Sequence, residues 1–260
     1  MNDPAARPGA AAGEELVRLA SADNFRDVAG PGLRTADGVP LRAGVLYRSN
    51  ELGLTDEDAA TIAGLGVRAV YDLRDRHEVE AHPDVEVPGA ANEHLEVRGI
   101  PMDQVASLAT VQQADDVMHR VYRGFVEHPG GRAAFAALLG RLADGTEPQL
   151  FHCTAGKDRT GWAAALVLHV AGVAWAEIER DYLRTNDRSA GTRRKYLGMV
   201  REHLGEELVE VYERVMVADA AYLATAHDAA LAAHGSLEGY LREGLGLSTT
   251  ELDRLRARLV

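Results

Sequence analysis

Three residues that can do chemistry on an anion lie within seven positions of one another: Cys153, Lys157 and Arg159. Cys153 is the only cysteine among 260 residues, and Lys157 is one of two lysines beside 26 arginines. A cysteine acts as a nucleophile in its thiolate form, which is favoured where positive charge surrounds the sulfur. Arginine offers a planar fork of N–H groups that matches two oxygens of a phosphoryl group. The spacing therefore predicts nucleophilic attack by Cys153 on a bound oxyanion.

The segments on either side of these residues predict a strand, a tight loop and a helix. Residues 148–152 read as a short strand, and residues 160–171 carry apolar side chains at helical spacing. A loop closed in this way can turn successive backbone N–H groups inward as an anion nest, here at Thr154, Ala155 and Gly156. The helix adds the positive end of its dipole at the same place. We expect this loop to bind the phosphoryl oxygens.

Such a reaction needs a proton at the leaving oxygen and a base for the attacking water, and one carboxyl group can serve both steps. Asp158 lies inside the loop and is the first candidate. Asp72 ends a predicted strand, residues 67–73, whose carboxyl end would lie beside the loop. Each has a structural alternative: Asp158 could bond to loop amides, and Asp72 could pair with Arg74 or Arg48.

The ten residues His152–Gly161, HCTAGKDRTG, resemble the C-x5-R-S/T-G signature of cysteine-dependent phosphatases. The Gly-Lys-Asp-Arg form is similar to that of the PtpB-like family of bacterial tyrosine phosphatases. The chemistry does not require Asn24, Arg26 or Asp27, which we expect to form scaffold hydrogen bonds around the site. The resemblance covers roughly residues 20–260, because four further segments look like family landmarks in matching order: Asn24–Val28, Tyr47–Ser49, Asp72–Arg74 and Asp181–Leu183.

This resemblance implies an α/β fold in which helices flank a central sheet and a C-terminal helical subdomain covers the site. Residues 189–234 match the region that forms a lid in the family. The resemblance also implies a catalytic acid at Asp158, which we therefore rank ahead of Asp72. We expect no cofactor.

Three more residues of the signature have expected roles. His152 precedes the nucleophile and is expected to orient the loop and tune the thiolate, the alternative being a core histidine. Thr160 could donate its hydroxyl to the sulfur during hydrolysis, or it could cap the helix. The ammonium group of Lys157 could bind a second phosphate, since the Gly-Lys-x-Arg arrangement is similar to that in phosphoinositide phosphatases; otherwise it faces solvent.

The order of the predicted elements also favours an α/β architecture. Residues 1–13 predict a disordered tail, and residues 14–260 then form one phosphatase domain. After residue 172 the pattern stays helical to the C-terminus and includes a long tract over 206–234. Before it, predicted helices alternate with predicted strands: strands 45–47, 67–73 and 148–152, and helices 55–65 and 131–145.

Composition excludes several classes of function. A net charge of −12 and a pI near 5.3 argue against nucleic-acid binding, which draws its affinity from clustered cations. The window 51–100 holds twelve acidic residues against four arginines, which we interpret as a solvated surface. The ten histidines show no His-Glu-x-x-His or similar spacing, so we expect no metal site.

Membrane and export signals are also not readable in the sequence. The strongest apolar run, residues 162–175, is too short to cross a bilayer. The first twenty residues lack a cationic start followed by an apolar stretch, so no secretory signal peptide is indicated. We therefore expect a cytoplasmic protein without an integral membrane segment, although the family resemblance also allows export without such a signal.

Together the residues predict a cysteine-dependent phosphomonoesterase that forms a cysteinyl-phosphate. Phosphotyrosine proteins are the expected substrates, with phosphoserine or phosphothreonine proteins and phosphoinositide lipids as further candidates. One alternative is an inactive domain that binds phosphorylated ligands or inositol lipids, against which the complete set of Cys153, Arg159 and Thr160 argues. A second is a sulfurtransferase with a persulfide on Cys153, which Asp158, Thr160 and the strict arginine spacing disfavour.

Overall fold

A five-stranded sheet forms the centre of the molecule in the computed structural model, which describes residues 17–260 apart from the side chain of Met102. The predicted tail, residues 1–13, lies outside the described residues. The strand order is β1-β2-β5-β3-β4, with β1 antiparallel to β2 and the other neighbours parallel. The strands are β1 (Arg26–Asp27), β2 (Leu46–Ser49), β3 (Ala69–Asp72), β4 (Ala91–His94) and β5 (Gln149–His152).

The register of the sheet brings three strand ends together. Ser49 at the end of β2 and Asp72 at the end of β3 both lie beside His152, the last residue of β5. Ligand sites of parallel sheets form at the carboxyl ends of the strands. Cys153 follows His152 directly, so the loop begins at the edge where such a site is expected.

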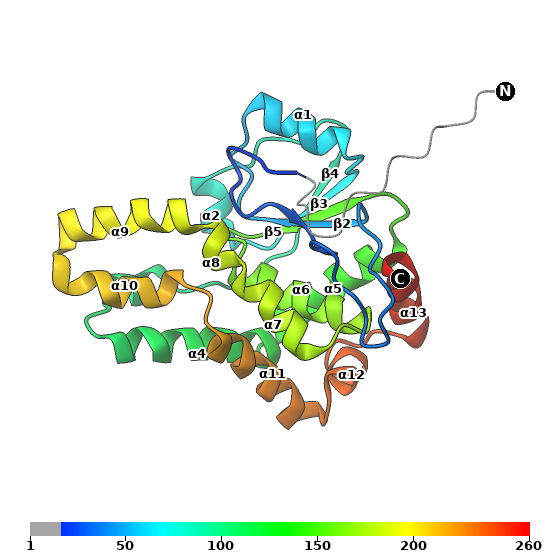
Figure 1. Ribbon diagram of the computed structural model, residues 1–260. Helices are drawn as coiled ribbons and strands as arrows, with labels where there is room; N and C mark the ends of the chain where they lie inside the picture. Colours follow the sequence, from blue (N-terminus) through cyan, green and yellow to red (C-terminus); the bar gives the residue numbers. More distant parts are fainter. Residues whose placement is uncertain (1–16) are drawn as a thin grey trace.

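Helices cover both faces of this sheet, which confirms the predicted α/β class with flanking helices (Figure 1). One face carries α1 (Asp56–Gly64) together with the segment before β1. The other face carries a larger layer that contains α5 and α6 from the predicted helices 131–145 and 160–171. That layer consists of α4 (Val111–Glu127), α5 (Pro129–Asp144), α6 (Asp158–Val170), α7 (Trp175–Leu183), α11 (Ala220–His234), α12 (Leu237–Gly239) and α13 (Thr249–Leu259).

Strand β5 and helix α6 hold the loop between them from inside the core. Leu150 of β5 packs in the cluster around α1 and Phe151 packs in the larger cluster, because side chains alternate along a strand. From Gly161 to Leu168 helix α6 carries no charged side chain and is buried on every side, including Trp162 and Leu166, as expected for a helix enclosed by other elements. The ends of the loop are therefore fixed by packing on both faces.

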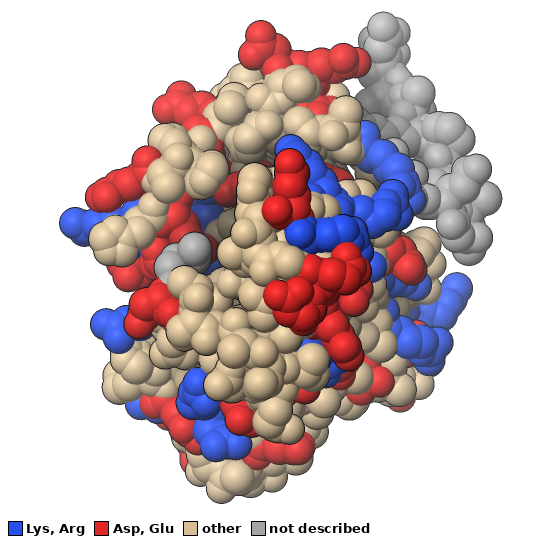
Figure 2. All heavy atoms as spheres, turned by 90° about the vertical axis from the view of Figure 1, so that its left-hand side faces the viewer, with Lys and Arg blue, Asp and Glu red and all other residues tan. Residues whose placement is uncertain are grey.

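Short helices and turns connect these layers. At the left of Figure 1, α9 lies beside α10, and α10 packs against α4, so these helices project beyond the sheet. Acidic and basic side chains are interspersed over that end of the molecule, which Figure 2 views directly. The remaining elements are α2 (Arg76–Ala81), α3 (Met102–Ala106), α8 (Thr185–Arg188), α9 (Ala190–Leu204), the 3-10 turn η1 (Glu206–Leu208), α10 (Val209–Met216) and the π-helical turn η2 (Tyr240–Gly244).

The prediction of one long helical tract over 206–234 was wrong. The chain breaks between α10 and α11 at residues 217–219, where Val217 takes an extended backbone conformation. Asp219 caps α11, and the Asn186 side chain bonds to both the N–H and the carbonyl group of Ala218. The break is only three residues long, so the apolar spacing continues across it and hides it in the sequence.

Candidate active site

The loop 153–157 makes a tight turn from β5 into α6. Gly156 has a φ of +64°, a conformation that other residues rarely adopt. Helix α6 begins at Asp158, and no side chain caps its first N–H groups, which leaves them available to an anion. Thr160 is the third residue of that helix, so the alternative in which it caps the helix is wrong.

Hydrogen bonds from outside the loop turn its carbonyl groups away from the centre. The Asn24 amide donates to the carbonyl oxygens of Ala155 (2.9 Å) and Gly156 (3.0 Å), and Arg48 also donates to Gly156 (3.0 Å). In a trans peptide the N–H group points opposite to the carbonyl group. The N–H groups of Gly156 and Lys157 are therefore directed inward, which is the geometry of an anion nest.

The expected scaffold hydrogen bonds at the N-terminal landmark are present. Arg26 donates to the Asn24 side chain, and the buried Asp181 carboxylate lies 3.0 Å from Arg48. Asp27 accepts from two backbone N–H groups, although burial still raises the pKa of its carboxyl group to about 6. Asn24 and Arg48 thus hold the loop from its outer side, and they are in turn held by Arg26 and Asp181.

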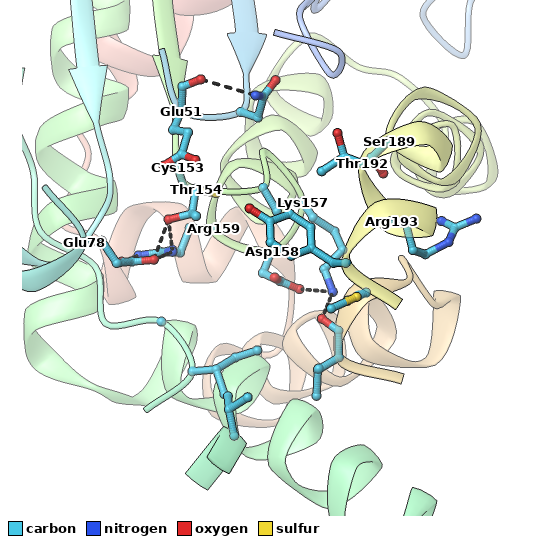
Figure 3. A pocket seen from close by; sticks show the side chains of 18 of the residues that line it. Glu51, Glu78, Cys153, Thr154, Lys157, Asp158, Arg159, Ser189, Thr192 and Arg193 are labelled. Carbon is cyan, nitrogen blue, oxygen red and sulfur yellow. Dashed lines mark hydrogen bonds and ion pairs between the residues drawn. The ribbon is translucent and has the colours of Figure 1, made fainter. Parts of the chain in front are cut away.

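A cavity of about 420 Å³ lies directly above the loop. Its floor contains most of the residues that the sequence singled out, and Figure 3 shows them converging from the loop and α6. Its roof is formed by side chains of α9 and α10, including Tyr196 and Met216. The floor residues are Cys153, Thr154, Ala155, Lys157, Asp158 and Arg159.

Arg159 is buried at one side of this floor and is held by a carboxylate. Its Nη2 lies 2.7 Å from Glu78 Oε1, and its Nη1 also reaches the Val97 carbonyl (3.3 Å). Burial lowers the pKa of Arg159, but the bonds to Glu78 and the charge of Cys153 outweigh it and keep the guanidinium protonated. Burial likewise raises the pKa of Glu78, and the bond and charge of Arg159 reverse this and lower it to about 2.

Asp158 lines the cavity beside Lys157. The Tyr122 hydroxyl donates to Asp158 Oδ1 at 2.8 Å, and Lys157 Nζ lies 3.3 Å from the same oxygen (Figure 3 draws the lysine contact). Lys157 Nζ also donates to the carbonyl groups of Val215 (2.7 Å) and Val217 (3.0 Å). Because Lys157 is only 2% exposed, the solvent-facing alternative for this residue is wrong.

Asp72 does not line the cavity with Asp158. It accepts from Arg74 Nε (3.0 Å) and Nη2 (2.8 Å), which is the ion-pair alternative that the sequence left open. His152 is buried beneath the loop, with Nε2 at 3.1 Å from Asp84 Oδ2. Burial raises the pKa of Asp84, but contact with His152 outweighs it and lowers the pKa below its usual range.

Three side chains in this layer have the spacing of metal ligands: Asp72, Asp84 and His152 lie within 4.8 Å of one another. The guanidinium of Arg74, however, contacts Asp72 (2.8 Å) and Asp84 (2.9 Å). A protein cation thus already balances both carboxylates, and we interpret the group as an ion-pair network that supports the loop.

The comparison with known proteins decides the family. The sequence model of the tyrosine phosphatase family matches residues 17–260, the whole described part of the chain. The chain belongs to the tyrosine phosphatase family. It is 33% identical to the triple specificity protein phosphatase PtpB of Mycobacterium tuberculosis, over 93% of this chain and 98% of the relative. It is also 31% identical to a tyrosine-protein phosphatase of Nostoc commune, over 84% and 75%.

The predicted resemblance is therefore confirmed, and the chain is an enzyme of the tyrosine phosphatase class. No helix within residues 17–260 combines the length and apolar character that a membrane crossing needs.

Sequence reasoning about this phosphatase missed several residues of the site. Glu78 and Asp84 fall in the acidic window 51–100, whose interpretation as a solvated surface was wrong for these two partners of Arg159 and His152. A capping box links Glu78 to Asp75, and this signal could have fixed its place at the start of α2.

Proposed function

We propose that this phosphatase hydrolyses phosphotyrosine esters through a cysteinyl-phosphate on Cys153. Support comes from one observation: the inward N–H groups of the loop, the open end of α6 and Arg159 converge over a buried cysteine at the floor of a cavity. In the first step an S–P bond forms and the P–O ester bond breaks. In the second step water attacks phosphorus, the S–P bond breaks, and inorganic phosphate leaves with the thiolate restored.

The charge of the transferred phosphoryl group is carried by the loop and the arginine. Such transition states need positioning and electrostatic stabilisation more than further covalent chemistry. Glu78 contacts both terminal nitrogens of Arg159 and so fixes the plane of the guanidinium. The side of the Arg159 guanidinium that carries Nε is then left to donate to the phosphoryl oxygens.

Asp158 is our choice for the acid and base. It lines the same cavity as Cys153, whereas Asp72 is engaged by Arg74. Asp158 would give a proton to the leaving phenolate and then take one from the attacking water. Thr160 is buried, and its hydroxyl has no hydrogen-bond partner among the described residues, which supports donation to the sulfur as it leaves phosphorus.

The roof of the cavity is our candidate lid. Tyr196 from α9 and Met216 from α10 line the cavity on the side facing the loop, and we infer that these helices shift to admit a large substrate. They fall within residues 189–234, the tract matched to the lid by resemblance.

Phosphoserine or phosphothreonine proteins and phosphoinositides are proposed as additional substrates. The relative from Mycobacterium tuberculosis is named a triple specificity protein phosphatase, which supports a broad range of substrates. Lys157 lines the cavity and could meet a second phosphate, but only after releasing the carbonyl groups of Val215 and Val217. Rates on matched phosphotyrosine and phosphothreonine peptides and on a short-chain phosphoinositide would rank the three classes.

The Cys153→Ser variant tests the mechanism. We expect it to lose hydrolysis of p-nitrophenyl phosphate by on the order of 10⁴-fold or more, because the nucleophile is removed. Vanadate should inhibit the unchanged protein, and EDTA should not. Single turnover of a phosphotyrosine peptide followed by acid quench should trap phosphate on Cys153.

Three outcomes would contradict this function. Retained hydrolysis in Cys153→Ser would exclude the cysteinyl-phosphate. A wild-type protein that binds a phosphotyrosine peptide without turnover would be the inactive binding domain, and formation of thiocyanate from thiosulfate and cyanide would indicate a sulfurtransferase.

A further inference from the structure

Tyr122 reaches the proposed acid from a distant part of the sequence. It lies on α4, is fully buried, and places its hydroxyl 2.8 Å from Asp158 Oδ1. A second contact joins the Tyr122 hydroxyl to that of Tyr182, on α7, at 2.7 Å. Tyr182 lies in the family landmark Asp181–Leu183, but no sequence pattern connects either tyrosine with the reaction.

The direction of these hydrogen bonds follows from their chemistry. A phenol has one proton, and a carboxylate can only accept, so Tyr122 donates to Asp158 and Tyr182 donates to Tyr122. Burial and the charge of Asp158 hold the pKa of both phenols well above the ordinary value, so both keep their protons.

The last glycine of the loop signature makes room for this chain. A Cβ built on Gly161 would lie 2.9 Å from Cδ2 of the Tyr182 ring, closer than such atoms approach. Gly161 thus allows Tyr182 to pack directly on α6, where its hydroxyl can reach Tyr122. The packing of Tyr122 and Tyr182 therefore depends on a glycine of the loop signature.

We propose that Tyr122 is a positioning residue that fixes the catalytic carboxyl of Asp158. Oδ1 is engaged by Tyr122 and lies near the ammonium group of Lys157, so Oδ2 is left to exchange a proton with the substrate. Without the phenol the carboxyl group can rotate, and its proton misses the leaving oxygen more often. This inference rests on the proposed role of Asp158.

Leaving groups of different basicity separate a positioning role from a structural one. A strongly basic leaving oxygen needs a well-placed proton, whereas p-nitrophenolate leaves readily without one. We expect Tyr122→Phe to lower kcat/KM about tenfold or more for phenyl and alkyl phosphates, and less than about threefold for p-nitrophenyl phosphate. Damage to the loop itself would lower all three rates by the same factor.

Two further tyrosine variants provide a matched control and an independent test. Tyr222→Phe removes another buried hydroxyl whose ring lies 6.0 Å from Tyr122, but that hydroxyl bonds to Asp115 and should leave all rates unchanged. Tyr182→Phe keeps the bond to Asp158 and should give a weaker loss with the same dependence on leaving group. It tests the proposal even if Tyr122→Phe does not fold.

A double-mutant cycle with Asp158→Asn completes the test. If Tyr122 acts through Asp158, adding Tyr122→Phe to Asp158→Asn should cause no further loss. Equal losses on all leaving groups, or additive losses in the double variant, would overturn the positioning role. If the rate loss in Asp158→Asn does not depend on the leaving group, the proposed role of Asp158 as the acid is wrong. Hydrolysis by Cys153→Ser would instead refute the cysteinyl-phosphate mechanism.

Discussion

The floor and the roof of the cavity are built in opposite ways. In the floor, Cys153 and Lys157 are each 2% exposed, and the loop backbone is held by side chains from β1 and β2 and their flanking residues. In the roof, Tyr196 of α9 is 47% exposed. Because a buried network holds the residues of the floor, the geometry of the floor depends little on the exposed helices that cover it. From this contrast we propose that the floor carries the chemistry and that the roof determines the choice of substrate.

The floor and the roof are joined at few places. Lys157 in the floor donates to the carbonyl groups of Val215 and Val217, at the end of α10. Thr192 of α9 bonds to Asp23, which also lines the cavity. Movement of the roof therefore requires these contacts to break, while the network below remains intact.

The largest effect is expected where the floor backbone is most constrained, at Gly156. A Cβ there would lie 2.5 Å from the Ser49 carbonyl oxygen and 2.7 Å from Asn50 N, and φ is +64°. We expect Gly156→Ala to lower the free energy of unfolding by at least about 2 kcal/mol and kcat/KM by on the order of 100-fold. Urea unfolding and p-nitrophenyl phosphate kinetics measure both.

Gly198 in α9 is the matched control in the roof, because no atom lies within 4 Å of a Cβ built there. Gly198→Ala should stabilise the helix by about 0.5–1 kcal/mol and leave the rate unchanged. If the two alanine variants lost stability equally, the contrast between floor and roof would be refuted.

A smaller effect is expected at Glu78, which holds the floor arginine from the side. Glu78→Gln removes the charge that fixes Arg159, so kcat/KM should fall by about tenfold to a hundredfold. Glu80→Gln, on the exposed side of the same helix, is the control and should leave kcat/KM unchanged. Equal rates in both variants would mean that Arg159 is positioned without Glu78.

The pH dependence of stability provides a second measure of this ion pair. The pKa of Glu78 is lowered from 4.5 to about 2, so its contribution to folding is complete above 4.5 and is lost as the pH falls toward 2. The difference in free energy of unfolding between the wild-type protein and Glu78→Gln should therefore be larger at neutral pH than near pH 3. A constant difference between these pH values would contradict the lowered pKa.

The smallest effect is expected in the roof at Tyr196. Its ring lines the cavity and can stack on an aromatic substrate, a contact worth about 0.5–1.5 kcal/mol. Tyr196→Ala should lower kcat/KM for a phosphotyrosine peptide by about twofold to tenfold and leave the thermal midpoint unchanged. Met199→Ala, exposed on the same helix, is the control. A larger loss on alkyl phosphates than on phosphotyrosine would reverse the assignment of Tyr196.

The fold and the floor of this site were largely predictable from local signals. The short strand before Cys153 and the apolar helix after it predicted the position of the loop. The two glycines and Arg159 lie within the same ten residues. The inward N–H groups then follow from backbone geometry. For this reason the floor residues named from the sequence line one cavity.

The supporting residues were not predictable because they act across long separations. Asp158 and Tyr122 are 36 positions apart, and Arg159 and Glu78 are 81 apart. A single sequence contains no signal for such pairs, since a buried ion pair and a solvated carboxylate use the same residue types. The break at residues 217–219 was missed for a related reason, because Asn186 stabilises it from another helix.

The isolation of Cys153 has a consequence for redox chemistry. A reactive thiolate is readily oxidised to a sulfenic acid, which many proteins protect by forming a disulfide with a second cysteine. With one cysteine in the chain, that protection cannot arise within a single molecule. An oxidised Cys153 must instead condense with a nearby backbone nitrogen or meet a thiol from solution. Such a thiol would have to enter the cavity that α9 and α10 help to line, so the helices that we propose for substrate choice would also influence reductive repair of the enzyme.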